Sequence, residues 1–335
     1  MSVTRRTVLA LGMLALVSTP LFAETPKSIG KIERLDPAIN KLIPADSVIE
    51  VLADGFDWSE GPVWVPQGEY ALFSDIPPNR IMKWKEGEGI SIFMEPSGYT
   101  GKAPFTGKEP GTNGLALNAK GELTACCHGD RNLVKFVDGK RVVLADKYDG
   151  KRFNSPNDLV IHSSGDIYFT DPPYGLPKNF DDPGREQDWC GVYRLKKDGT
   201  VDLVTSKQTR PNGVGLSPDE KTLYVAQSDP QAATITRYPL NADGSVGEGT
   251  VFYDGTSQVG KVKGLPDGMA VDATGNIWAT GPGGVLVFTP EGKQIGLLNT
   301  GEATANCTFG ADGYLYITAD MYFCRVKTNV SGIKK

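Results

Sequence analysis

The chain has 335 residues, 40 of them glycine and 23 proline, and its formal net charge at pH 7 is −5. An acidic chain without a basic stripe lacks the electrostatic footprint of a nucleic-acid-binding protein, so we expect no nucleic acid partner. Apolar residues show little helical periodicity, and a single all-β domain of this length is ordinary.

The first 23 residues have the pattern of an export signal. A basic segment containing Arg5 and Arg6 precedes a mostly apolar run over residues 7–17, and Ala23 ends a candidate cleavage site. The apolar run is too short for a comfortable membrane span. The stretch TRRTVL resembles a twin-arginine signal, with an ordinary secretory signal as the alternative. We therefore expect a periplasmic protein without stable membrane insertion once the signal is removed.

Residues 24–47 are an N-terminal arm for which the sequence predicts no particular structure. From residue 60 onward, one short phrase recurs six times at separations of 53, 44, 55, 55 and 39 residues. Each copy begins with an acidic or amide residue, and these lead residues are Glu60, Asn113, Asn157, Asn212, Asp267 and Asn306. Each copy reads as a β-hairpin, with an apolar run such as NDLVI, a turn, and a second run such as IYFT.

Candidate third and fourth strands follow most of the hairpins. Six repeats of four strands predict an all-β fold, a six-bladed β-propeller over residues 48–335. The last repeat offers only three strands, and a spare strand at residues 48–52 precedes the first hairpin. We expect this N-terminal strand to complete the last blade and close the ring, which removes open sheet edges. An open array of hairpins is the alternative.

Closure of the ring would bring the lead side chains to one point. Carboxylate and amide oxygens are ligands for a hard cation. Neither His nor Cys occupies a lead position, which argues against a structural zinc site. We therefore expect one divalent metal ion, Ca²⁺ ahead of Mg²⁺, Mn²⁺ or Zn²⁺. The alternative is that the Asn and Asp residues cap turns and that the backbone conformation requires the small residues after them.

A second series of polar residues, Asp75, His128, Asp171 and Asp320, follows the lead residues at a distance of 14 or 15 positions. Because the ends of a hairpin meet, these residues must share the face of the lead residues. His128 could contact substrate hydroxyl groups or transfer protons near neutral pH, or it could only stabilise a turn. We expect the three aspartates to hold loops, and we interpret His162 as structural.

The cysteine count is odd, so at least one thiol has no partner within the chain. The five residues are Cys126, Cys127, Cys190, Cys307 and Cys324. Cys307 and Cys324 share the last blade and could form a disulfide in an oxidising compartment. Burial as small apolar residues is the favoured interpretation.

Several phrases together resemble a known family. SEGPVW (59–64), FNSPNDLV (153–160), IYFTDPPYGL (167–176), RPNGVGLSPDEKTLYV (210–225) and LPDGMAVDATGNIW (265–278) are similar, in this order, to the senescence-marker protein, gluconolactonase and luciferin-regenerating enzyme superfamily. They cover most of residues 50–325. FTDPPYGL and ACCHGDRNL resemble the bacterial gluconolactonases more than the animal members.

The resemblance implies hydrolysis of a sugar lactone, a small molecule, to the aldonic acid. It implies that Glu60, Asn212 and Asp267 hold one divalent metal and that Asn157 contacts substrate or water. Some relatives of the animal type carry Arg two residues before that Asn, whereas this chain has Ser155.

A bound cation would polarise the lactone carbonyl and acidify water. Asp267 would then be both a ligand and a candidate general base, and Asn113 or Asn157 would donate to the oxyanion. Asp267 and Asn157 are thus the catalytic candidates, and Asn113, Asn157 and His128 are candidates for substrate binding. A metal-dependent esterase or phosphotriesterase and a non-catalytic calcium-binding propeller are the alternative functions.

Two long loops, residues 98–111 and 178–190, are candidates for substrate specificity. The second loop contains Phe180 and Trp189, and aromatic faces over a sugar site would shape the pocket. We therefore include Trp189 among the expected substrate-binding residues.

Overall fold

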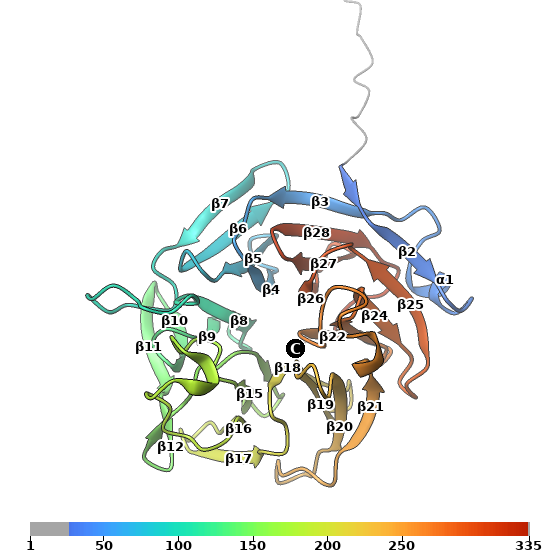
Figure 1. Ribbon diagram of the computed structural model, residues 1–335. Coiled ribbons are helices and arrows are strands. Elements are labelled where there is room, and N and C mark those ends of the chain that lie inside the picture. Colours follow the sequence, from blue (N-terminus) through green and yellow to red (C-terminus); the bar gives the residue numbers. More distant parts are fainter. Residues whose placement is uncertain (1–26, 334–335) are drawn as a thin grey trace, which may run out of the picture.

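The computed structural model describes residues 27–333, so the predicted export signal lies outside the described residues. Six antiparallel sheets surround a central channel as the blades of a propeller (Figure 1). The predicted all-β, six-bladed fold is confirmed. Between residues 27 and 333, no helix has the length and apolar character needed to cross a bilayer.

Blades one to four each contain four strands that follow one another in the chain. Blade one consists of β4 (Ser59–Val65), β5 (Tyr70–Asp75), β6 (Arg80–Lys85) and β7 (Gly89–Met94). Blade two consists of β8 (Thr112–Leu117), β9 (Leu123–Cys127), β10 (Asn132–Val137) and β11 (Lys140–Ala145). Blade three consists of β14 (Leu159–Ile161), β15 (Ile167–Asp171), β16 (Gly191–Leu195) and β17 (Val201–Thr205). Blade four consists of β18 (Pro211–Leu216), β19 (Thr222–Gln227), β20 (Thr234–Pro239) and β21 (Thr250–Asp254).

Blades five and six combine strands from both ends of the chain. Blade five consists of β22 (Met269–Val271), β23 (Ile277–Gly281), β24 (Gly284–Phe288), β25 (Gln294–Asn299) and β2 (Lys31–Arg34). Blade six consists of β26 (Thr304–Phe309), β27 (Tyr314–Ala319), β28 (Tyr322–Lys327), β3 (Ile49–Asp54) and β1 (Ser28–Ile29). Short elements lie in the connections: α1 (Ile39–Leu42), β12 (Lys147–Tyr148), β13 (Lys151–Arg152), η1 (Asn179–Asp181) and η2 (Thr256–Gln258).

The N-terminal strand closes the ring as predicted. β3 pairs antiparallel with β28 and brings Val51 opposite Cys324. The strand expected at residues 48–52 is therefore present, over Ile49–Asp54. The innermost strands β4, β8, β14, β18, β22 and β26 contact one another in a closed circle, which excludes an open array.

The N-terminal arm is part of the propeller and not a separate segment. β1 pairs with β3, and β2 pairs with β25, so two blades have five strands where four were expected. In the segment between β2 and β3, Ile39 and Ile43 are completely buried against the core of blades five and six. The elements β1, β2 and α1 are two to four residues long, which is too short for a periodic sequence pattern. They form because they pair with or pack against strands of blades five and six.

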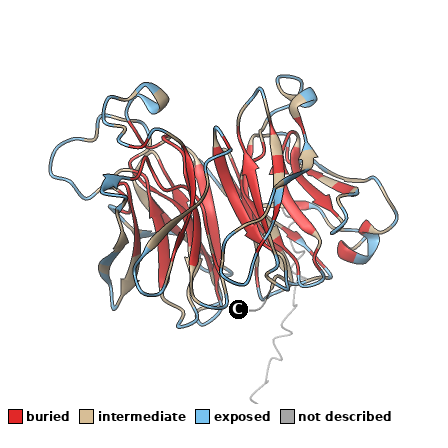
Figure 2. Cartoon of the chain, turned by 90° about the horizontal axis from the view of Figure 1, so that it is seen from below, coloured by how far each residue is buried: buried red, intermediate tan, exposed pale blue. Residues whose placement is uncertain are grey.

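The hydrophobic core lies between neighbouring blades. At the closure, Phe73 of blade one stacks on Phe323 of blade six with ring centroids 4.2 Å apart, and Trp64 stacks on Tyr316 at 5.3 Å. Each such ring contributes about 1.5–3 kcal/mol of burial free energy, so the closure is stabilised by packing as well as by strand pairing. In Figure 2 the inner strands of the blades are buried over most of their length, whereas outermost strands such as β7, β11 and β17 are exposed or intermediate.

The C-terminal segment covers one mouth of the channel. The Ala273 N–H donates to the Ser331 carbonyl at 2.9 Å, and Gly332 pairs with Asp272. The last residues that the structure describes thus lie at the centre of the ring (Figure 1). The other mouth lies at the ends of the inner strands where the lead residues stand.

Candidate active site

The lead residues of five blades line one cavity of about 480 Å³ at this other mouth. They are Glu60, Asn113, Asn157, Asn212 and Asp267. The remaining wall has both apolar and polar side chains, among them Trp58, Glu109, Tyr174, Arg210, Ser228, Val259, Val262 and Leu265. The structure therefore brings all three predicted metal ligands and both predicted asparagine contacts to one site.

Glycines after the lead residues allow the blades to approach so closely. A Cβ atom on Gly61 would lie 2.0 Å from the carbonyl oxygen of Asn113, and one on Gly213 would lie 2.0 Å from the carbonyl oxygen of Asp267. The Gly213 N–H donates to that Asp267 carbonyl at 3.1 Å. These positions need glycine because the backbones of neighbouring blades are in contact there. This close approach brings the lead side chains together.

The lead residue of blade six departs from this pattern. Asn306 lines a second cavity of about 220 Å³ farther along the channel, together with Asp158, and Thr304 faces the first cavity instead. The Asn306 side chain forms hydrogen bonds with Glu60 and Asp158, which oppose the rise in pKa that burial causes in both carboxyl groups. The six lead residues therefore lie close together, although only five of them line the first cavity.

Buried oxygens without partners mark the centre of the site. Oδ1 of Asp267, of Asn113 and of Asn157 each lack a hydrogen-bond partner within residues 27–333. Asn212 Nδ2 donates to Ser228 Oγ at 2.8 Å, which leaves its amide oxygen for the cavity. Glu60 Oε2 accepts the Gly61 N–H at 2.6 Å. Buried acceptors without partners are unfavourable, so this set fits a cation or a protic ligand.

The electrostatics of the site favour a cation. Burial raises the pKa of Glu60 to about 8 and that of Asp158 to about 7. Burial and then the neighbouring Glu60 raise the pKa of Asp267 well above its usual range. Arg210 is the only basic side chain among the described residues that line the cavity. A divalent ion would stabilise the charged carboxylates that this environment disfavours.

A metal ion at this site would need a mixed set of ligands. Within the described part of the chain, no three His, Cys, Asp or Glu side chains are close enough to hold a metal ion by themselves. Amide oxygens such as those of Asn212, Asn157 and Asn113 would therefore be needed beside Glu60 and Asp267. This is the carboxylate and amide combination that the repeat pattern predicts.

His128 lies on the predicted face but behind the cavity wall. Its side chain is completely buried, and Nδ1 is 3.1 Å from Glu109 Oε2. Nε2 is 3.4 Å from Nδ2 of Asn113 and 3.4 Å from Nδ2 of Asn157. Glu109 was not singled out from the sequence, because it belongs to no repeat position; its only signal was its place in loop 98–111.

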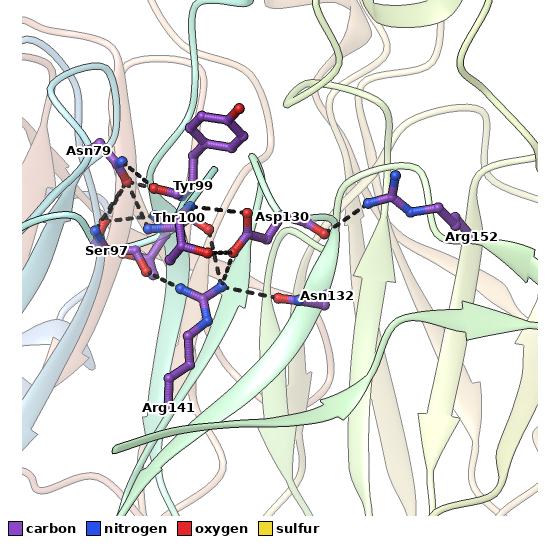
Figure 3. Close-up of polar contacts among 10 residues, drawn as sticks. Asn79, Ser97, Tyr99, Thr100, Asp130, Asn132, Arg141 and Arg152 are labelled. Carbon is purple, nitrogen blue, oxygen red and sulfur yellow. Dashed lines mark hydrogen bonds and ion pairs between the residues drawn. The ribbon is translucent and has the colours of Figure 1, made fainter. Parts of the chain in front are cut away.

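The loop that carries Glu109 is held by side chains at its start (Figure 3). Asn79 Oδ1 accepts the N–H groups of Ser97, Gly98 and Tyr99 at 2.8–3.2 Å. Arg141 donates to the Ser97 carbonyl at 2.8 Å.

Asp130 extends the same network from blade two (Figure 3). It accepts both the N–H and the hydroxyl of Thr100, and it forms an ion pair with Arg141 at 3.0 Å. At the other end of the loop, the Gly111 N–H donates to the Ile76 carbonyl at 3.1 Å. Loop 98–111 is therefore bound to both neighbouring blades.

Loop 178–190 reaches the site through a residue other than the predicted one. Trp189 does not line the cavity; its Nε1 donates to the Tyr193 hydroxyl at 3.0 Å. Its position gives no support to a substrate contact. Phe180 of the same loop instead packs under the guanidinium of Arg210, 4.7 Å from its ring centroid.

The expectations for Asp75, for Asp171 and for the cysteines are confirmed. Asp75 accepts two backbone N–H groups before β4, and Asp171 accepts the Asn154 N–H at 2.8 Å, so both hold loops. Ser155 accepts the Gly175 N–H at 2.9 Å and thereby fixes the turn that carries Tyr174. All five cysteines are buried free thiols, so Cys307 and Cys324 form no disulfide.

A larger cavity of about 900 Å³ lies at the opposite ends of the strands of blades two to four. It contains His162, which faces Glu220 with Nε2 and Oε2 3.3 Å apart, in agreement with a structural role. None of the six lead residues lines this cavity. The chemistry of its wall, and not its size, identifies the smaller cavity as the candidate active site.

The chain is similar in sequence to a known protein family and to lactonases within it. Residues 58–320 match the model of the SMP-30/Gluconolactonase/LRE-like region. A gluconolactonase of Zymomonas mobilis is 41% identical over 91% of this chain and 88% of its own length. Pentonolactonase XacC of Haloferax volcanii is 28% identical over 77% of this chain and 80% of its own length.

Solved structures show the same architecture. A gluconolactonase from Xanthomonas campestris is 31% identical, with a TM-score of 0.80 over 92% of this chain and 99% of that one. A regucalcin from Agrobacterium tumefaciens, at 21% identity and a TM-score of 0.64 over 85% and 94% of the two chains, shares the fold. By the extent of the family match and by these identities, the chain belongs to the SMP-30/gluconolactonase/LRE-like family.

Proposed function

We propose that the protein hydrolyses a sugar lactone of the gluconolactone type to the aldonic acid, with one divalent cation in the cavity. The observation that carries this proposal is the convergence of Glu60, Asn212 and Asp267 on a cavity of about 480 Å³. A cavity of this size suits a small molecule. The names of two relatives, a gluconolactonase and a pentonolactonase, support a lactone as the substrate class.

Glu60, Asn212 and Asp267 would hold the cation. Their hard oxygen donors and two negative charges favour Ca²⁺, with Mg²⁺, Mn²⁺ or Zn²⁺ as alternatives. When bound, the ion would polarise the lactone carbonyl and lower the pKa of water.

Side chains of the cavity would then orient the reactants. Asp267 Oδ1 has no partner and is available to accept a proton from the attacking water. The amide nitrogens of Asn113 and Asn157 face His128, so their oxygens are the groups left for water and sugar hydroxyls.

Arg210 supplies donors on the rim of the cavity. Within the described residues, the Arg210 side chain forms no hydrogen bond or ion pair. Its guanidinium group packs on the ring of Phe180. It would bind ring oxygens of the lactone and, after ring opening, the carboxylate of the product.

A substrate panel tests the proposal. The purified protein, supplied with Ca²⁺, is assayed on glucono-δ-lactone, other aldonolactones, an aryl ester and a phosphotriester. We expect the highest kcat/KM on an aldonolactone. A higher kcat/KM on the aryl ester or the phosphotriester would contradict the lactonase function and favour an esterase or a phosphotriesterase. If no compound is hydrolysed, the result would favour a non-catalytic binding protein.

We also propose that this reaction takes place in the periplasm. The support is the TRRTVL stretch at residues 4–9, before a short apolar run.

A further inference from the structure

The chain has only two histidines, and one of them lies between a carboxylate and two cavity asparagines. His128 has Glu109 Oε2 at 3.1 Å from Nδ1 and the amide nitrogens of Asn113 and Asn157 at 3.4 Å from Nε2. The imidazole is completely buried, and all three neighbours line the cavity.

These neighbours determine where the imidazole carries its proton. A carboxylate oxygen only accepts, so Nδ1 must be the donor toward Glu109. With that proton on Nδ1, Nε2 is unprotonated and accepts from the amide NH₂ groups of Asn113 and Asn157. The proton on Nδ1 thus faces the carboxylate of Glu109 at an ion-pair distance of 3.1 Å, and Nε2 faces the two amides at 3.4 Å.

The orientation of the two amides follows from that tautomer. With both Nδ2 atoms turned to His128, both Oδ1 atoms point the other way, and these are among the buried oxygens that lack a partner. If Nε2 carried the proton instead, each amide would form a hydrogen bond with it only by turning its oxygen toward the histidine. Its nitrogen would then face the cavity, and the site would lose two acceptors.

The surroundings of His128 leave the ring little freedom to change this arrangement. A Cβ atom on Gly175 would lie 2.5 Å from His128 Cβ, so the turn after β15 packs directly against the side chain. The His128 N–H donates to the Gly111 carbonyl at 3.1 Å, which ties it to the loop that carries Glu109.

We propose that His128, oriented by Glu109, is a positioning residue that turns the amide oxygens of Asn113 and Asn157 toward the cavity. There they accept hydrogen bonds from water and from the hydroxyl groups of the sugar lactone, and they complete the oxygen environment of the cation. The consequence for catalysis rests on the proposed lactonase function, whereas the tautomer and the amide orientation do not.

Matched variants separate this role from simple packing. His128→Gln keeps an acceptor near the position of Nε2, whereas His128→Leu fills similar space without one. Glu109→Gln keeps a carbonyl oxygen for the Nδ1–H, whereas Glu109→Leu removes it. His162→Leu is the control, because it removes the other histidine–glutamate pair, with Glu220 at 3.3 Å, far from the cavity.

We expect His128→Leu and Glu109→Leu to lower kcat on glucono-δ-lactone by about 10–100-fold, the usual effect of losing a residue that orients ligands. Both should also weaken Ca²⁺ binding measured by calorimetry. His128→Gln and Glu109→Gln should recover most of both losses at an unchanged thermal unfolding midpoint, and His162→Leu should have wild-type activity and affinity. Equal losses in the leucine and glutamine variants would overturn the positioning role.

The tautomer is measured directly on ¹⁵N-histidine-labelled protein by long-range ¹H–¹⁵N correlation. The His162→Leu variant leaves His128 as the single labelled ring, and we expect its proton on Nδ1. A proton on Nε2, or on both nitrogens, would refute the proposal even if the leucine variants fail to fold. If the wild type hydrolyses no lactone while the tautomer and the Ca²⁺ affinities are as expected, the positioning role stands and the proposed function fails.

Discussion

At the scale of single residues, the three proposed cation ligands differ in charge. Glu60 and Asp267 each bring a carboxylate, and Asn212 brings an amide oxygen that Ser228 orients. A divalent ion gains more from a charged oxygen than from an amide dipole.

We therefore expect Glu60→Gln and Asp267→Asn to weaken Ca²⁺ binding by more than about 100-fold, beyond the range typical of orienting residues. Asn212→Ala should retain weak activity that high Ca²⁺ concentrations restore. Titration calorimetry and kinetics at several Ca²⁺ concentrations measure both effects. A larger loss of affinity in Asn212→Ala than in the carboxylate variants would show that charge does not dominate the site.

The raised pKa values predict how stability depends on pH. Folding raises the pKa of Glu60 from 4.5 to about 8 and that of Asp158 from 3.8 to about 7. A carboxyl group with a raised pKa favours the folded state while protonated, and this contribution is lost as the pH rises through the folded-state pKa. The chelated protein should thus lose stability between about pH 4 and pH 8.

Thermal unfolding of the chelated protein at pH 5 and pH 8 checks this expectation. Added Ca²⁺ should raise the unfolding midpoint more at pH 8 than at pH 5, because the ligands are then charged. The Glu60→Gln variant should show a flatter pH profile. A wild-type profile no steeper than that of this variant would mean that Glu60 does not carry the effect.

At the scale of elements, loop 178–190 offers two aromatic residues with different positions. Phe180 supports Arg210 at the cavity, whereas Trp189 donates to Tyr193 away from it. We expect Phe180→Ala to change the ranking of aldonolactones by kcat/KM, by a few-fold per compound, without changing Ca²⁺ affinity. Trp189→Ala is the matched comparison and should leave the ranking unchanged. The reverse outcome would restore Trp189 as the substrate contact.

Strand β3 closes the ring, and the segment before it adds to two blades. A variant that begins at Lys27 should have normal thermal stability. One that begins at Val48 should lose several kcal/mol, because it removes the buried Ile39 and Ile43. One that begins at Phe56 lacks β3, exposes the edge of β28, and should be insoluble. Equal unfolding midpoints of all three would contradict the closure of the ring by β3.

The repeat pattern was enough to predict the blades, the closing strand and five residues of the cavity wall. A residue at a fixed repeat position, such as Asn212, is placed by the symmetry of the fold. Glu109, Tyr174 and Arg210 lie outside the lead and second series, and only the folded loops bring them to the cavity. The sequence likewise could not show that Trp189 turns away or that Asn306 lines the second cavity, because local hydrogen bonds to Tyr193 and to Glu60 accompany these positions.

At the scale of the whole molecule, the predicted export signal is a separate question from catalysis. If the protein is exported by the twin-arginine route, replacing Arg5 and Arg6 by lysine should retain it in the cytoplasm. Cell fractionation with immunodetection of both forms measures this. Periplasmic recovery of the double variant would favour an ordinary secretory signal, and cytoplasmic recovery of the wild type would contradict export.

The central claim is that the lead residues of the propeller form a cation-dependent lactonase site. Hydrolysis of glucono-δ-lactone by the wild type and by Glu60→Gln, measured before chelation, after it, and after return of Ca²⁺, tests this claim most directly. We expect wild-type activity to vanish on chelation and to return with Ca²⁺, and the variant to stay inactive throughout. Full activity of the chelated, metal-free wild type would contradict the claim.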